Sequence, residues 1–414
     1  MWRFIALYGM SEMAQRVTRL ATTVLLARTM SAVDLGIAAM AITCFEVMRV
    51  VANSGIAQAV IRATDARLAG TCVTAYRLFW AVCIALTAAQ LAVGAGIGAW
   101  TGHWDVMAMI ACLGGVYLMM PMGIIQCCLI QRSSRHGTMA AVGATQAVTD
   151  NLLTIGLALA GFGAWAIVLP KLLTCPIWVA GMRRGQVWTP DRSAIAVPQS
   201  EIVRFALPVL GAEMVTTLRL QLDKMMVGAM LGIEALGIYY FIFNAGIGLT
   251  LALTGVLSNS LYPHFASVAD APRTLLERLD RSLLTTSLPI AGVVVLQAAM
   301  AQVYVPLLFG AQWTAYAWMV GVLCLSASTK LLSDSGSLAL RAAGATRFDF
   351  AGTLVVTCAS LTGLAAGMMF GLAGGVIALA VASGVSQLGF AVMARQRVAG
   401  LVYGRSDEPD ASAV

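Results

Sequence analysis

Apolar stretches long enough to cross a lipid bilayer recur along the whole chain. The 414 residues are 59% hydrophobic and 11% charged, against about 25% charged residues in an average soluble domain. About 20 apolar residues in a helix span the hydrocarbon layer. Backbone polar groups at that depth must be satisfied within the protein, and helices do this within one segment. The sequence therefore predicts an all-α polytopic membrane protein.

Division of the apolar stretches at about 20 residues per helix predicts twelve transmembrane helices. In the first half they are 4–28, 35–61, 71–97, 105–130, 138–160 and 163–182. In the second half they are 202–231, 235–262, 281–307, 314–338, 349–370 and 374–394. The first span carries Glu12, Arg16 and Arg19, unlike the apolar core of a cleavable signal peptide.

Arginines gather in alternate connections between these spans. The connections after even-numbered spans carry Arg62 and Arg67; Arg132 and Arg135; Arg183, Arg184 and Arg192; Arg273 and Arg278; and Arg341 and Arg347. Connections after odd-numbered spans are short and nearly uncharged. By the positive-inside rule both termini are cytoplasmic. This topology accounts for the net charge of +7 without a nucleic-acid partner.

The chain divides into two similar halves. We predict a first lobe of six helices at 1–182, a cytoplasmic linker at 183–201, a second lobe of six at 202–396 and a cytoplasmic tail at 397–414. Leu26–Ile37 resembles Val227–Ile238, and Gly161–Ile167 resembles Gly371–Ile377. An even number of spans per half predicts lobes related by a pseudo-two-fold axis along the membrane normal, with a polar path between them.

The stretch 210–240 carries unusually many ions for a membrane span. Glu213, Thr217, Gln221 and Lys224 share one helical face. Arg219 and Asp223 lie four apart on nearly the opposite face, where they can neutralise each other. Intramembrane ions cost about 2.5–3.5 kcal/mol each on insertion scales and normally face a bundle interior.

Other spans carry similar groups near mid-depth. They are Arg16 and Arg19 with Glu12, Arg49 with Glu46 and Asn53, Asp150 with Asn151, Lys171, and Lys330 with Asp334. Acid–base pairs on one helix can be structural, whereas Arg19 and Lys171 have no local partner and are stronger candidates for substrate contacts. Asp150 could pair with Lys171 across helices.

Enzymatic chemistry finds little support. The three histidines lie at span ends, and no catalytic, nucleotide-binding or zinc motif occurs in a workable context. The nine cysteines fall in apolar segments without CxxC spacing, which predicts buried reduced thiols. We expect no enzymatic activity, cofactor or metal site.

Short motifs in a consistent order resemble one family of membrane proteins. Leu26-Ala-Arg28-x-x-Ser31-x-x-Asp34-Leu-Gly36 resembles the signature that closes the first helix of polysaccharide-lipid flippases, except that its usual proline is Ala32. Leu222-Asp-Lys224, Leu261-Tyr-Pro263 and Leu308-Phe-Gly310-x-x-Trp313 follow in the expected places. These flippases belong to the multidrug/oligosaccharidyl-lipid/polysaccharide exporter superfamily.

The resemblance implies movement of an isoprenoid-pyrophosphate-linked oligosaccharide from the cytoplasmic to the outer leaflet of a bacterial inner membrane. The path would be a central polar cavity with alternating access. We expect the anionic head to meet Arg16, Arg19, Arg49, Lys171, Lys224 and Lys330. The candidates for coupling to a proton or cation are Asp150, Asp223 and Asp334. The resemblance also implies a polysaccharide polymerase and assembly proteins as partners.

Two alternatives remain open. A cation-coupled drug or metabolite exporter of the same superfamily would need a more acidic or aromatic pocket, and aromatic residues make up only 7% of the chain. A non-transporting scaffold in a polysaccharide assembly complex would leave the intramembrane ions without a task, so loss of Arg19 and Lys171 would be harmless.

Overall fold

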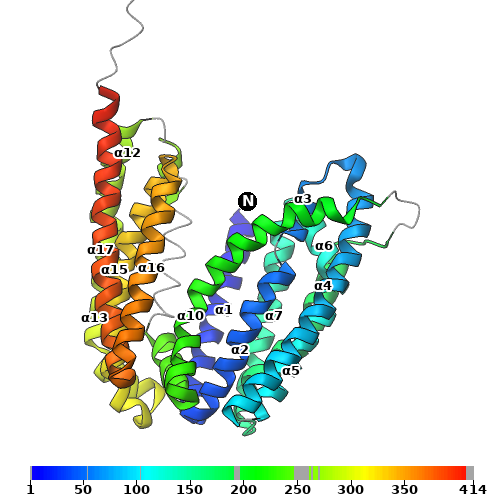
Figure 1. The fold of residues 1–414 in the computed structure, drawn as a ribbon, viewed down its shortest axis with the longest axis horizontal. Coiled ribbons are helices and arrows are strands. Elements are labelled where there is room, and N and C mark those ends of the chain that lie inside the picture. Colours follow the sequence, from blue (N-terminus) through cyan, green and yellow to red (C-terminus); the bar gives the residue numbers. More distant parts are fainter. Residues whose placement is uncertain are drawn as a thin grey trace, which may run out of the picture. The chain divides into compact units, whose positions relative to one another are not determined.

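The computed structural model describes residues 2–53, 55–102, 104–190, 196–246, 261–262, 264–268 and 271–406. Side chains at 2–14, 16, 53, 101, 136, 212, 216 and 401–406 lie outside this description. Helices and short connections make up these ranges, with no strand among them (Figure 1). In the first half the helices are α1 (Trp2–Thr29), α2 (Ala32–Asn53), α3 (Ile56–Arg62), α4 (Asp65–Thr101), α5 (Trp104–Met119), α6 (Pro121–Arg132), α7 (His136–Leu159), α8 (Trp165–Leu173) and α9 (Cys175–Gly185). They continue with α10 (Gln199–Ala245), α12 (Pro272–Ser282), η1 (Leu283–Ser287), α13 (Leu288–Ala299), α14 (Ala301–Tyr304), η2 (Val305–Phe309), η3 (Ala311–Tyr316), α15 (Ala317–Ala342), α16 (Thr346–Met368) and α17 (Gly371–Ser406).

The all-α membrane fold predicted from the sequence is confirmed. Within the described ranges, eight helical segments are long and apolar enough to cross a membrane, and a ninth results if the bent pair α5–α6 is one span. Helices α1 and α7 match the first and fifth predicted spans in position and length but are not among these apolar segments. The eighth predicted span, 235–262, runs into 247–260, which lie outside the described residues. The total of twelve therefore stays a prediction.

Glycine and proline break several spans into two helices. Gly55, with φ of 75°, separates α2 from α3, and Pro121 begins α6 at a bend of 54° from α5. Gly232, with φ of 86°, interrupts α10. Glycine adopts positive φ at little cost, and proline cannot donate the backbone hydrogen bond of a helix interior. The break at Gly232 matches the predicted boundary between the seventh and eighth spans.

The contacts group the chain into two compact units. Unit 1 comprises residues 1–228 and 232–237, and unit 2 comprises residues 229–231 and 238–414. Residues 202–228, which the repeat assigns to the second lobe, pack within unit 1. The predicted lobes follow sequence repetition and the units follow packing, so the lobe boundaries stay a prediction.

The start of α10 packs on the first half of the chain. Ile202 and Ala206 are buried in one apolar cluster with Ile56 and Val60 of α3 and Phe79 of α4. The connection that precedes α10 is also attached, because Thr74 Oγ1 donates a hydrogen bond to the carbonyl of residue 197 at 2.8 Å. The predicted cytoplasmic linker therefore lies against α4 where it is described.

Two repeated segments cross at a pair of glycines inside unit 1. A Cβ on Gly36 would lie 2.0 Å from the Ile233 carbonyl oxygen, and one on Gly237 would lie 1.7 Å from the Ala32 carbonyl oxygen. Each glycine faces the carbonyl four residues before the other, as a local two-fold axis would require. The glycines hold these positions because any side chain would push the two backbones apart.

Beside this crossing, Ser31 and Asp34 cap the start of α2. The Asp34 carboxylate accepts from the Ser31 N–H at 3.2 Å, and the Ser31 hydroxyl accepts from the Asp34 N–H at 3.1 Å. This reciprocal arrangement is a capping box. The signature at 26–36 therefore combines a helix start with a close helix crossing.

In unit 2, α15, α16 and α17 run alongside one another (Figure 1). Helices α16 and α17 approach through small residues, and a Cβ on Gly367 would lie 2.4 Å from the Gly374 carbonyl oxygen. Close backbone approach over small side chains is a common way to pack membrane helices. In the same unit, Phe241 stacks on Trp313 with ring centroids 3.9 Å apart.

The cysteines follow the sequence prediction only in part. All nine are free thiols, but Cys358 on α16 is exposed, and Cys44, Cys112 and Cys127 are half-buried. A face that meets lipid rather than protein can be as apolar as a core. An apolar segment therefore does not by itself predict burial inside the protein.

Candidate functional site

Helix α7 joins α1 to α8 through two adjacent polar residues. Lys171 Nζ donates to Asp150 Oδ2 at 2.5 Å, which confirms the predicted pairing across helices. Asn151 Nδ2 donates to Thr18 Oγ1 of α1 at 3.2 Å. Neighbours on a helix point about 100° apart, so Asp150 and Asn151 reach different partners. We call Thr18, Arg19, Asp150, Asn151 and Lys171 the α1–α7–α8 site.

Lys171 lies in the last turn of a short helix. Helix α8 ends at Leu173, and α9 begins immediately afterwards with a proline in its first turn. The Thr174 hydroxyl donates a hydrogen bond to the Pro170 carbonyl at 2.8 Å. The Lys171 ammonium therefore lies near the negative end of the α8 dipole, a favourable place for a cation.

The Asp150 carboxylate is only half satisfied. Its Oδ2 pairs with Lys171, whereas its Oδ1 is buried and has no hydrogen-bond donor among the described residues. Its side chain is 13% exposed and that of Lys171 is 39% exposed. A buried carboxylate oxygen without a hydrogen bond is costly. Such an oxygen is normally satisfied by a bound water or ion, or is retained because it has a role in function.

The predicted arginines of α1 and α2 lie in different surroundings. The Arg19 side chain on α1 is exposed, and no described residue accepts a hydrogen bond from its guanidinium. Arg49 on α2 pairs with Glu46 at 2.7 Å and lies 5.9 Å from the centroid of the Phe45 ring. The predicted Glu46–Arg49 pair is therefore confirmed. The side chains of Arg16 and Glu12 lie outside the described residues.

On α10 the predicted ion pairing is wrong. Asp223 Oδ1 accepts from Lys224 Nζ at 3.3 Å and from the Lys224 backbone N–H at 2.8 Å. It therefore pairs with Lys224 rather than with Arg219, which is exposed. The pairing follows from burial, because Lys224 is only 7% exposed and a buried ammonium needs an anion close by.

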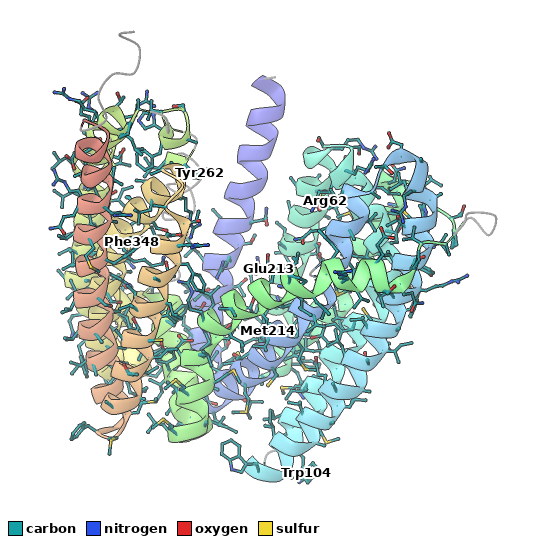
Figure 2. The ribbon with its side chains drawn as sticks, turned by 45° about the horizontal axis from the view of Figure 1, so that its top comes forward. Arg62, Trp104, Glu213, Met214, Tyr262 and Phe348 are labelled. Atoms are coloured by element: carbon teal, nitrogen blue, oxygen red, sulfur yellow. The ribbon has the colours of Figure 1, made fainter. Side chains whose placement is uncertain are left out.

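The polar face predicted along α10 is buried at one end only. Glu213 is exposed, and Figure 2 shows it beside Met214 on α10. At the other end, the Lys224 ammonium also donates to the Leu220 carbonyl at 3.1 Å. Lys224 is thus more engaged with the protein than a freely presented substrate contact would be.

Unit 2 contains the last predicted pair. Lys330 Nζ lies 2.8 Å from Asp334 Oδ1 and 2.7 Å from Asp334 Oδ2 on α15, so the predicted i,i+4 pairing is confirmed. The residue directly before Lys330 also makes a contact, because Thr329 Oγ1 donates to the Gln387 side chain of α17 at 2.6 Å. Helix α15 is thus tied to α17 next to this ion pair.

The choice of lysine or arginine is a further signal in the sequence for the positions of these ion pairs. Lys171, Lys224 and Lys330 are the three lysines of the chain, and every other basic residue apart from histidine is arginine. Each of the three lysines pairs with one of the three candidate coupling aspartates. An ammonium is a compact point charge on a flexible stem, unlike the planar fork of a guanidinium, so these three pairs are a group of their own among the cations of the chain.

The described residues do not group into a metal centre. Among them, no three His, Cys, Asp or Glu side chains are placed to hold one ion.

Comparisons with known proteins agree on both family and fold. The family described as "Polysacc_synt_3: Polysaccharide biosynthesis protein" matches residues 25–318. The "Succinoglycan biosynthesis transport protein ExoT" of Rhizobium meliloti (strain 1021) is 23% identical over 317 residues. That match covers 74% of this chain and 62% of the relative, so the chain spans less than two thirds of the relative's length.

Solved structures show the same fold at low sequence identity. A "Lipid II flippase MurJ" in an inward closed conformation superposes with a TM-score of 0.73 and 11% identity, over 98% of this chain and 94% of that one. An inward-facing MATE multidrug resistance transporter of the MOP superfamily gives 0.69 and 13% over 94% and 96%. The chain therefore has the helical, two-lobed fold of these multi-pass membrane transporters.

Proposed function

Since this chain belongs to the Polysacc_synt_3 family of polysaccharide biosynthesis proteins, we propose that it flips an isoprenoid-pyrophosphate-linked oligosaccharide across a bacterial inner membrane. The glycan passes from the cytoplasmic to the outer leaflet by alternating access, and both termini are cytoplasmic. A polysaccharide polymerase and assembly proteins act on the product. The family, the relative named as a succinoglycan biosynthesis transport protein and the transporter fold support this proposal.

Arg19 carries the proposal. Its guanidinium is exposed on α1, beside Thr18, which contacts α7, and no described acidic group compensates it. A cation at membrane depth is costly unless it meets an anion or water. A pyrophosphate supplies that anion, and the planar fork of arginine matches phosphate oxygens. Arg49, Lys171, Lys224 and Lys330, with Arg16, are the further proposed contacts.

Asp150 is the favoured coupling group. Its unpaired Oδ1 can take up a proton or a small cation, and neutralising Asp150 releases Lys171 to meet the substrate. Asp223 and Asp334 hold Lys224 and Lys330 in the same way. Uptake of a proton or cation by these aspartates would thus alternate with binding of the substrate by the lysines that they hold.

Reconstituted transport tests the proposal. Proteoliposomes that hold a lipid-pyrophosphate glycan in one leaflet should lose asymmetry with wild-type protein, and Arg19→Ala should slow this at least tenfold. Arg183→Ala, which removes an exposed arginine at the end of α9, is the matched control and should flip normally. If the wild-type protein flips none of the glycan lipids tried, the proposed flippase function is refuted. Uptake of cationic compounds instead would favour a drug exporter, and active Arg19→Ala would contradict the role of Arg19.

A further inference from the structure

A cavity lined by both charged and apolar residues lies in unit 1, where α3 ends and α4 and α10 begin. Its volume is about 250 Å³, and its lining includes Arg62, Thr64, Arg67, Thr71, Glu201 and Phe205. None of these residues belongs to the α1–α7–α8 site. By the distribution of arginines, this end of the helices faces the cytoplasm.

The turn that carries Arg62 is fixed by a side chain from another helix. Arg132 of α6 donates from Nη1 to the Ile61 carbonyl at 2.8 Å and to the Ala63 carbonyl. Its Nη2 donates to Asp65 Oδ1 at 2.6 Å. These contacts hold the backbone between α3 and α4 in one conformation, so the cavity wall is preorganised.

Arg62 presents an unused guanidinium. Its Cζ lies 5.0 Å from the centroid of the Phe205 ring, a cation–π contact that orients the group without using its N–H donors. No described residue accepts a hydrogen bond from that guanidinium, and Figure 2 labels Arg62 at the end of α3.

Arg67 is held by a carboxylate of the protein itself. Arg67 Nη2 donates to Glu201 Oε2 at 2.7 Å, and both side chains are about half exposed. This hydrogen bond from Arg67 is the main cause that lowers the pKa of the Glu201 carboxyl. The carboxylate therefore occupies one anion position in the cavity.

We propose that this cavity binds the phosphate headgroup of a membrane lipid, with Arg62 and Arg67 as its ligands and Glu201 as an internal competitor. The lining has two cations and one anion, so displacement of Glu201 leaves a double positive charge for a doubly charged headgroup. The inference rests on the proposed function in one respect, since the headgroup is taken to be the pyrophosphate of the transported glycan lipid. The cavity is then where the substrate first docks, before it reaches Arg19.

Binding of inorganic pyrophosphate to the full chain in detergent tests the cavity. Isothermal titration at low salt compares wild type, the double variant Arg62→Gln with Arg67→Gln, Glu201→Gln, and the control Arg183→Gln. Two charge-assisted contacts are lost in the double variant, so its Kd should rise at least about tenfold. Glu201→Gln should bind a few times more tightly, because the competitor is gone. The control should match wild type.

Equal affinity in wild type and the double variant, or weaker binding by Glu201→Gln, would overturn the proposal. A thermal unfolding scan of each variant shows that it is folded, and Arg62→Lys, which keeps the charge but loses the fork, should fall between wild type and the double variant. Competition with vesicles of phosphatidylcholine that contain either an isoprenoid pyrophosphate or phosphatidylglycerol identifies the source. Preference for phosphatidylglycerol would overturn the assignment to the substrate.

The two proposals fail separately. Normal flipping by the double variant together with unchanged pyrophosphate affinity would refute the headgroup site in the cavity and leave the proposed flippase function standing. Absence of flipping by wild type, with the expected order of pyrophosphate affinities, would refute the flippase function and support the headgroup site in the cavity.

Discussion

Replacement of Gly237 by alanine tests the crossing of the two repeated segments. The new Cβ would lie 1.7 Å from the Ala32 carbonyl oxygen and 2.7 Å from the Gly36 nitrogen. Both are backbone atoms, so no side chain can rotate away. Real Cβ atoms essentially never approach other heavy atoms within 3.0 Å, so the segments must separate by about 1.3 Å.

The energetic cost follows from this displacement. A gap of about 0.5–1 Å already loses a quarter to a half of the dispersion attraction across a contact, and overpacking of a tight interior costs about 1–3 kcal/mol. Alanine returns up to about 1 kcal/mol through its helix propensity. We expect a net loss of about 1–2 kcal/mol, with a lower midpoint of thermal unfolding in detergent.

Gly156→Ala provides the matched control. Gly156 lies inside α7, and a Cβ there meets nothing within 4 Å, so its midpoint should stay or rise. Gly36→Ala should resemble Gly237→Ala, and the double variant should cost less than the two together, since one separation relieves both clashes. A midpoint for Gly237→Ala at or above that of Gly156→Ala would refute the reasoning.

Three further predictions concern ion pairs and one aromatic contact. Asp150→Asn should destabilise the protein by about 1–3 kcal/mol, because a charge-assisted hydrogen bond to Lys171 is lost, and adding Lys171→Met should restore part of the loss. Thermal unfolding of wild type and of both variants measures this, and equal midpoints for the single and double variants would contradict it. Trp313→Ala should cost about 3–5 kcal/mol, since Trp313 is buried against Phe241, while Trp104→Ala at an exposed position should cost little in the same scan. The pKa of Glu201 is lowered in the folded chain by Arg67, so its ion pair stabilises the fold above the ordinary carboxyl pKa of 4.5 and is lost as pH falls through the lower folded value. The difference in unfolding midpoint between wild type and Glu201→Gln should therefore be present at neutral pH and vanish in acid. A difference that grows in acid would contradict this prediction.

Much of this fold could be predicted from the sequence. Apolar length and arginine spacing predict membrane helices, because the hydrocarbon layer has a set thickness and excludes charge. The pairs Glu46–Arg49 and Lys330–Asp334 could be predicted because residues three or four apart share one face of a helix. The repeat at 26–37 and 227–238 also indicated two segments of equal role, and the glycines of both meet at the crossing.

Other features depend on the tertiary structure. Helical spacing favours Arg219 as the partner of Asp223, yet Asp223 pairs with Lys224, because packing buries that ammonium and leaves Arg219 exposed. The attachment of the start of α10 to α3 and α4 joins residues more than 130 positions apart, and no local pattern encodes it. The unpaired Asp150 oxygen and the cavity at Arg62 likewise arise only when separate helices come together. Periodicity along the sequence thus determined which residues share a helix face, whereas burial, which depends on every neighbouring helix, decided which charges pair and which stay available for a ligand.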